Sequence, residues 1–193
     1  MDQALANAPI RPNPWGDWPR IDESAYVDPS AQIIGKVAIG PRAFVAPGAV
    51  IRADEKAPDG SVAPVEIGAD CNIQDCVIVH SGQGAGIVIG DRVSLAHGCV
   101  VHGPAFIADD CFLGIRSAVI NATLEEGVWA GVGAVILEIT IPSHTFATGG
   151  TIINSTDKVA RLNPINEQDR TFQQGQVTSN QLLNKGYLAL RKS

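Results

Sequence analysis

The sequence predicts an all-β solenoid, a parallel β-helix of hexapeptide repeats followed by a C-terminal α-helix. Three observations carry this prediction. Apolar residues recur at every sixth position over most of the chain, and a small residue stands four positions after most of them. Helix signals are nearly absent before residue 154. A short fixed period of this kind is the signature of a hexapeptide β-helix.

Residues 1–20 are expected to form an extended N-terminal arm. Pro12, Pro14 and Pro19 oppose a helix there, because proline lacks a backbone N–H donor. The arm has no run of apolar residues, and no positively charged segment is followed by an apolar one. We therefore expect neither a secretory signal nor a membrane-spanning helix.

Residues 21–153 are expected to form the coil, with five to seven turns over residues 24–153. Three hexapeptides make one triangular turn, so residues eighteen apart stack about 4.8 Å apart. The apolar positions point inward and build ladders of like side chains. Two insertions and two single-residue deletions interrupt the period. The inward positions are Val27, Ile33, Ile39, Val45, Ile51, Ile67, Ile73, Val79, Ile89, Leu95, Val101, Ile107, Leu113, Val119, Leu124, Ala130, Ile136, Ile141 and Ala147.

Residues 154–193 are expected to form a helical segment that packs on the coil, which leaves a single domain overall. Ser155 is placed to cap a short helix, and Ser179 a longer one over residues 181–191. The polar stretch 163–176 between them is expected to be a linker, with room for a turn of helix. One side of the last helix is apolar and is expected to face the coil or a neighbouring chain; it carries Leu182, Leu183, Tyr187 and Leu190.

Composition excludes some function classes. A net charge of −6 and a pI near 5.1 leave no basic stripe for nucleic acid. The four cysteines form no CxxC pair and stand mostly at the small-residue position, as buried small side chains do. Reduced thiols predict a cytoplasmic location.

Three of the four histidines occupy defined places in the repeat. His80 and His102 each follow an inward residue of the same face, so they stack on adjacent turns with outward side chains and can share a metal ion. His97 lies on another face and cannot easily reach the same ion. The spacing therefore indicates that His97 comes from an adjacent subunit of a cyclic homotrimer. The alternative is three unrelated surface histidines, as we expect for His144.

Several separated motifs resemble the γ-class carbonic anhydrases and the related domain of the cyanobacterial carboxysomal scaffold protein. The similarity covers about residues 21 to 190 and implies a left-handed coil. The motifs are Ile51-Arg-Ala-Asp-Glu55, Asn72-Ile-Gln-Asp75, His80, Ser94-Leu-Ala-His97, His102-Gly-Pro-Ala105, Asn180 and Gly186-Tyr187.

The resemblance implies a site that hydrates CO2 to bicarbonate. His80, His97 and His102 would hold Zn2+, with Co2+ or Fe2+ as alternatives, and a bound water with a pKa near 7 would attack CO2. Glu55 would accept or relay the proton. The supporting roles implied are an interface ion pair of Arg52 with Asp54 or Asp75, a hydrogen bond from Gln74 to the attacking hydroxide, and positioning of substrate or product by Asn72 and Asn180.

The sequence departs from the family pattern after the first ligand. Well-studied fast members carry a long acidic loop there, whereas residues 81–86 are short and contain no acid. We therefore expect a slower enzyme, or one whose rate rises with buffer concentration.

Two other function classes stay open. Hexapeptide acyltransferases share the coil and use one histidine as a general base, although the chain shows no cationic groove for coenzyme A phosphates. A non-catalytic assembly module, in which the metal only staples the trimer, would match the scaffold relatives.

Overall fold

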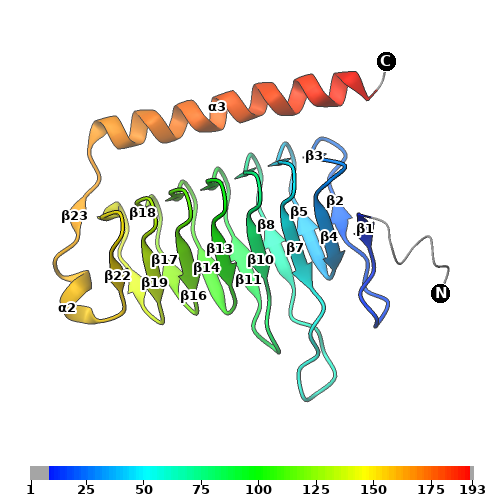
Figure 1. The fold of residues 1–193 in the computed structure, drawn as a ribbon, viewed down its shortest axis with the longest axis horizontal. Helices are drawn as coiled ribbons and strands as arrows, with labels where there is room; N and C mark the ends of the chain where they lie inside the picture. Colours follow the sequence, from blue (N-terminus) through cyan, green and yellow to red (C-terminus); the bar gives the residue numbers. More distant parts are fainter. Residues whose placement is uncertain (1–8, 192–193) are drawn as a thin grey trace.

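The computed structural model describes residues 9–191 and shows a left-handed parallel β-helix of about seven turns with a long C-terminal helix. Three sheets form the sides of the coil, which confirms the fold class expected from the period (Figure 1). Sheet A contains β1 (Ile10–Arg11), β4 (Gln32–Gly35), β7 (Val50–Ala53), β10 (Ile78–His80), β13 (Val100–His102), β16 (Ala118–Ile120), β19 (Val135–Leu137) and β22 (Ile152–Ile153). Sheet B contains β2 (Arg20–Ile21), β5 (Val37–Ile39), β8 (Val65–Ile67), β11 (Ile87–Ile89), β14 (Ala105–Ile107), β17 (Thr123–Leu124) and β20 (Thr140–Ile141). Sheet C contains β3 (Tyr26–Val27), β6 (Phe44–Val45), β9 (Asn72–Ile73), β12 (Ser94–Leu95), β15 (Phe112–Leu113), β18 (Trp129–Ala130), β21 (Thr145–Ala147) and the antiparallel β23 (Asn163–Pro164).

The register follows the predicted period, including its interruptions. Val79 pairs with Ile51 across the first insertion and with Val101 across the second. Val119 pairs with Ile136, because the turn between them is one residue shorter than three full hexapeptides. These inward side chains are fully buried, so each sheet lines the core with a ladder of aliphatic groups.

The coil begins earlier than the predicted boundary at residue 21. Within the stretch expected to be a separate arm, β1 pairs with β4 in sheet A and β2 pairs with β5 in sheet B. The proline-rich segment between them forms a turn that starts at Asn13, which is 1% exposed. Residues 1–8 of the expected arm lie outside the described residues.

The C-terminal helix is longer than the sequence predicted. The short helix α2 spans Thr156–Val159 with Ser155 at its N-cap, and α3 spans Glu167–Leu190. The helix α3 starts at a capping box in which Asn166 and Asp169 each accept a hydrogen bond from the other's backbone N–H. The expected linker over residues 163–176 and the expected cap at Ser179 are therefore wrong.

The helix α3 lies along sheet C (Figure 1). It docks through amide side chains and through aromatic contacts of Phe172 and Tyr187. Gln173 donates to the carbonyl oxygens of Arg92 and Cys111, at 2.8 and 3.1 Å, and Asn184 donates to that of Ser24 at 2.9 Å. Of the apolar side chains expected to face the coil or a neighbouring chain, Tyr187 stacks on Tyr26 with ring centroids 4.8 Å apart. Leu182, Leu183 and Leu190 are 46–69% exposed in the isolated chain. Among the described residues, no helix has both the length and the apolar character needed to cross a membrane.

Candidate metal centre

His80 and His102 lie side by side on the outer face of sheet A. They are register partners on β10 and β13, and their ring centroids are 5.3 Å apart. The His102 Nδ1–H donates to the carbonyl oxygen of Gly103 at 2.9 Å, so its Nε2 carries the lone pair. This neighbouring pair is the arrangement that the sequence predicted.

The Nε2 atom of His80 is buried and makes no hydrogen bond within the described structure. Burial lowers the pKa of His80 below its ordinary value, the nearby Arg52 charge acts in the same direction, and the Glu55 carboxylate opposes both. His80 is therefore neutral at pH 7 with a lone pair available. A buried imidazole nitrogen without a partner fits a metal ligand, since a buried polar atom otherwise costs about 1–3 kcal/mol.

Three charged residues surround the His80 ring. Arg52 is its register partner on β7. Glu55 Oε1 lies 3.4 Å and Asp54 Oδ1 lies 3.8 Å from His80 Nε2. The Arg52 guanidinium lies 3.3 Å from Asp54 and 3.9 Å from Glu55. The expected pairing of Arg52 with Asp54 is thus present within one chain.

His97 lies away from this group, at the corner that follows β12. Its side chain is 55% exposed, and its Nδ1–H donates to the Asp75 carboxylate at 2.7 Å. That bond orients the ring and leaves the Nε2 lone pair for a ligand, as a carboxylate does for many metal-binding histidines. Across residues 9–191, no three His, Cys, Asp or Glu side chains converge on one position that could hold a metal ion.

Gln74, Asn72 and Asn180 form a second group on the outer face of sheet C. Gln74 Nε2 donates to Asn72 Oδ1 at 2.5 Å and to Asn180 Oδ1 at 2.9 Å. Asn180 comes from α3 and is 6% exposed. The docked helix therefore fixes the Gln74 amide one residue before Asp75. These residues and His97 lie on one side of the coil, apart from the group around His80.

The structure adds one contact that the sequence did not predict. The indole Nε1–H of Trp15 donates to the carbonyl oxygen of Asp54 at 3.1 Å. No repeat position marks Trp15, because it lies in the turn between β1 and β2. The sequence signal that could have drawn attention to Trp15 is a tryptophan that lies among prolines and a glycine.

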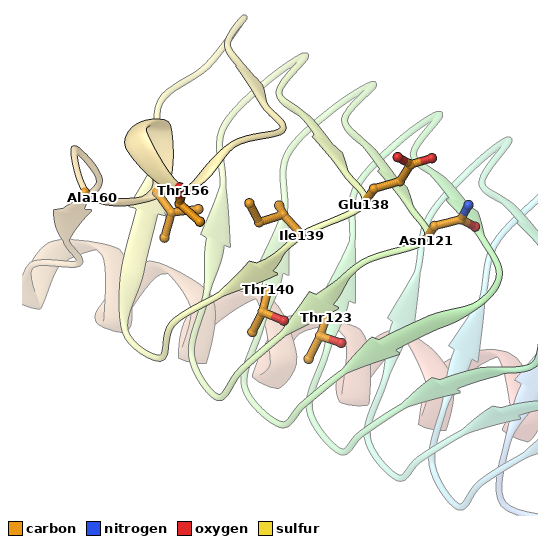
Figure 2. Close-up of a pocket in the computed structure, with 8 residues that line it drawn as sticks. Asn121, Thr123, Glu138, Ile139, Thr140, Thr156 and Ala160 are labelled. Carbon is orange, nitrogen blue, oxygen red and sulfur yellow. The ribbon is translucent and has the colours of Figure 1, made fainter.

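An open concavity of about 590 Å3 lies elsewhere, between sheet B and α2 (Figure 2). Glu138 is its one ionisable lining residue. None of the ten predicted site residues lines it, and we assign it no role.

The chain is similar to several proteins of known identity. It is 32% identical to the carbonic anhydrase of Methanosarcina thermophila, over 79% of this chain and 70% of that protein. It is 28% identical to gamma carbonic anhydrase 2 of Arabidopsis thaliana, over 73% of this chain and 44% of that protein. The chain belongs to the γ-class carbonic anhydrase family.

Another relative of this γ-class chain is the carboxysome assembly protein CcmM of Nostoc sp., with 36% identity over 98% of the chain. The chain spans only 36% of the length of that protein. No family model matches. Among solved structures, a hexapeptide transferase family protein from Anaplasma phagocytophilum has a TM-score of 0.75 at 27% identity, covering 91% of this chain and 96% of that one. The resemblance drawn from the motifs is confirmed.

Proposed function

We propose that the protein is a metal-dependent carbonic anhydrase whose sites form between the subunits of a homotrimer. The observation that carries the proposal is the division of the site into two halves on different faces. His80 and His102 have available nitrogens on sheet A, and His97 is held by Asp75 at the corner between sheets C and A. A rigid coil cannot bring these halves together within one chain.

Two parallel rows of side chains support the trimer. Along the outer face of sheet A, the register places Arg52, His80, His102, Ile120 and Leu137 one above another. Along the neighbouring corner, the residues three positions before the paired sheet A strands are Pro47, Asp75, His97, Ile115 and Val132. From the turn of His80 onward, the sheet A row passes from two histidines to aliphatic residues, and the corner row passes from Asp75 and His97 to aliphatic residues.

From the turn of His80 onward, the two rows have compatible chemistry at each level. Rotation about an axis parallel to the coil leaves each residue at its own level, so the corner of one copy faces the same levels of the next copy. His97 then meets the level of His102, with His80 one turn away. Ile115 meets Ile120, and Val132 meets the level of Leu137. The exposed fractions of 44% for Ile115 and 62% for Val132 leave aliphatic surface for that contact.

The three histidines would hold the ion, with Zn2+ as the expected metal and Co2+ or Fe2+ as alternatives. The chemistry that such an ion supplies is a water whose pKa falls toward 7, ready to attack CO2. The carboxylate of Glu55, 41% exposed and 3.4 Å from His80 Nε2, is placed to accept a proton and pass it to solvent. Asn72 and Asn180 accept both N–H groups of the Gln74 amide, which leaves Gln74 Oε1 as an acceptor for the O–H of the attacking hydroxide or of the product.

Stopped-flow CO2 hydration tests the proposal on protein purified without oxygen, with metal content counted per chain. We expect activity with about one metal per chain, and loss of both in His97→Ala. His144→Ala is the matched control, because His144 is exposed and lies on the later turn that contains β21. A chain without CO2 hydration that transfers an acyl group from acetyl-coenzyme A, with or without metal, would instead support the acyltransferase class, for which the similarity to the hexapeptide transferase family protein is the reason.

A second candidate is a metal-stapled assembly module without catalysis. The similarity to a carboxysome assembly protein over 98% of the chain favours it. A metal-loaded trimer without CO2 hydration in several buffers and with several metals would establish it. The cytoplasmic location stays a prediction, which cell fractionation can check.

A further inference from the structure

A cavity of about 220 Å3 lies where the helix α3 begins beside the last turns of the coil (Figure 1). Glu126 and Trp129 line it from the coil, and Asp169 and Gln173 line it from the first two turns of α3. None of its lining residues belongs to the candidate metal centre. The cavity therefore needs a separate chemical account.

The space for the cavity comes from an interruption in a row of corner side chains at Gly127. Asp110, Gly127 and His144 occupy the same corner position on successive turns, with φ angles of 59°, 66° and 55°. Because the residues on both sides of Gly127 carry side chains at this φ, the turn itself does not require glycine. A Cβ at Gly127 would lie 2.4 Å from His144 Nδ1. The glycine thus keeps space open beneath the His144 ring.

Gln173 supplies a buried hydrogen-bond acceptor at this cavity. The residue is 6% exposed, and its Nε2 donates to the carbonyl oxygens of Arg92 and Cys111 at 2.8 and 3.1 Å. Both amide protons are therefore used in docking α3 to the coil. Its Oε1 is buried and makes no hydrogen bond within residues 9–191. Because buried polar atoms normally have a partner, a molecule in the cavity with an N–H group would complete this one.

The charges around the cavity favour a cation. It is lined by three carboxylates, and those of Asp110 and Asp169 already accept hydrogen bonds within the chain. The exposed carboxylate of Glu126 has no such partner among the described residues. Arg170 also lines the cavity, but its guanidinium lies 3.5 Å from the Glu167 carboxylate. The charge left for a ligand to offset is therefore negative.

We propose that the cavity binds a small organic cation, a primary ammonium on a short aliphatic chain. The ammonium donates to Gln173 Oε1, the Glu126 carboxylate offsets its charge, and the aliphatic chain packs on the indole of Trp129. The volume of about 220 Å3 is below the roughly 300–1,000 Å3 of pockets for drug-sized molecules, so the ligand is a small free amine. A bare metal ion does not fit, because across residues 9–191 no three His, Cys, Asp or Glu side chains converge on one position.

Calorimetric titration of the full chain with 1,4-diaminobutane tests the site and needs no catalytic activity. We expect a Kd of about 0.1–1 mM, which is within the range for a ligand of this size. The uncharged 1,4-butanediol has the same length and should not bind. In NMR spectra of the titrated protein, the indole N–H signal of Trp129 should move, whereas those of Trp15 and Trp18, which do not line the cavity, should stay in place.

Three variants locate the binding. Glu126→Gln removes the unpaired charge and keeps the shape of the side chain, so we expect binding about tenfold weaker. Glu66→Gln is the matched control, because it removes the same charge from an exposed position on β8 and should leave the Kd unchanged. Gln173→Lys keeps N–H donors for the two carbonyl oxygens and supplies an ammonium of its own, so it should abolish binding.

Two results would overturn the proposal. Equal binding of the diol would show that charge is not recognised. An equal Kd in Glu126→Gln and Glu66→Gln, whether unchanged or weakened, would show that the amine does not bind at this cavity. The comparison of these two exposed glutamates decides the question even if Gln173→Lys fails to fold.

Discussion

A mixture of two inactive variants tests whether each site is shared between subunits. His97→Ala leaves the sheet A half intact, and His80→Ala leaves the corner half intact. Each variant alone lacks one half at every interface, so each is expected to be inactive. When both are assembled together, an interface regains a full site wherever a His97→Ala chain supplies sheet A and a His80→Ala chain supplies the corner.

The size of the rescue follows from the geometry of a ring. In a cyclic trimer that contains both kinds of chain, one of the three interfaces joins the sheet A half of a His97→Ala chain to the corner half of a His80→Ala chain. Random assembly at equal amounts places a full site at about one quarter of all interfaces, and a fraction f of one variant gives f(1 − f). Activity per chain should therefore peak near 25% of the wild-type value at equal mixing.

The assay is CO2 hydration with metal counting after the two chains are unfolded together and refolded, each with a different affinity tag. Trimers purified through both tags should carry about one metal per trimer. Mixing two folded variants without exchange of subunits is the control and should give no activity. An inactive refolded mixture, or His97→Ala protein that retains its metal and activity alone, would refute the division of the site between chains.

Three further outcomes are expected. Ile115→Asp should separate the trimer and lower its metal content with every ligand intact, because about 1 kcal/mol of burial per subunit is lost and a carboxylate is desolvated; analytical ultracentrifugation checks this. One thiol per native chain should react with a thiol reagent, that of the exposed Cys76, because burial raises the pKa of Cys71 and of Cys111 to about 12 and raises that of Cys99. The hydrogen bonds from Arg42 hold the pKa of Asp70 below 3.8, so Asp70→Asn should destabilise the fold at neutral pH, and the difference should shrink as the pH falls through the lowered pKa; urea unfolding at several pH values measures it.

The period predicted the half of the site on sheet A because that half depends only on register. Once inward positions are counted, His80 and His102 must be partners, and Arg52 must lie one turn away on the same face. The same counting placed Asp75 next to His97 across sheet C. The insertions do not disturb these relations, because each is accommodated at a corner and the strands on both sides keep their register.

The sequence predicted the second half of α3, over residues 181–191, but not the first half, whose docking includes the polar contacts of Gln173 and Asn180. A docked helix is normally recognised in a sequence by an apolar stripe along one side. The apolar stripe of α3 contains Leu182 and Leu183, which point to solvent in the isolated chain. Besides Phe172 and Tyr187, the docking face carries Gln173, Asn180 and Asn184, which bind groups on or beside sheet C. Amide spacing alone does not separate such a face from a solvated one.

The placement of Glu55 shows why an insertion can carry function that a repeat cannot. A strand residue of the coil is fixed by its register partners above and below, so its side chain can only point inward or straight outward. Glu55 lies just past the end of β7, where the chain leaves the ladder and can turn its carboxylate back toward His80. That freedom has to be removed again by contacts outside the repeat, and the turn from Asn13 to Asp17 makes them at Ala53 and Asp54. The β-helix therefore fixes the proposed ligands by register, whereas Glu55 beside them lies at the start of an insertion outside that register.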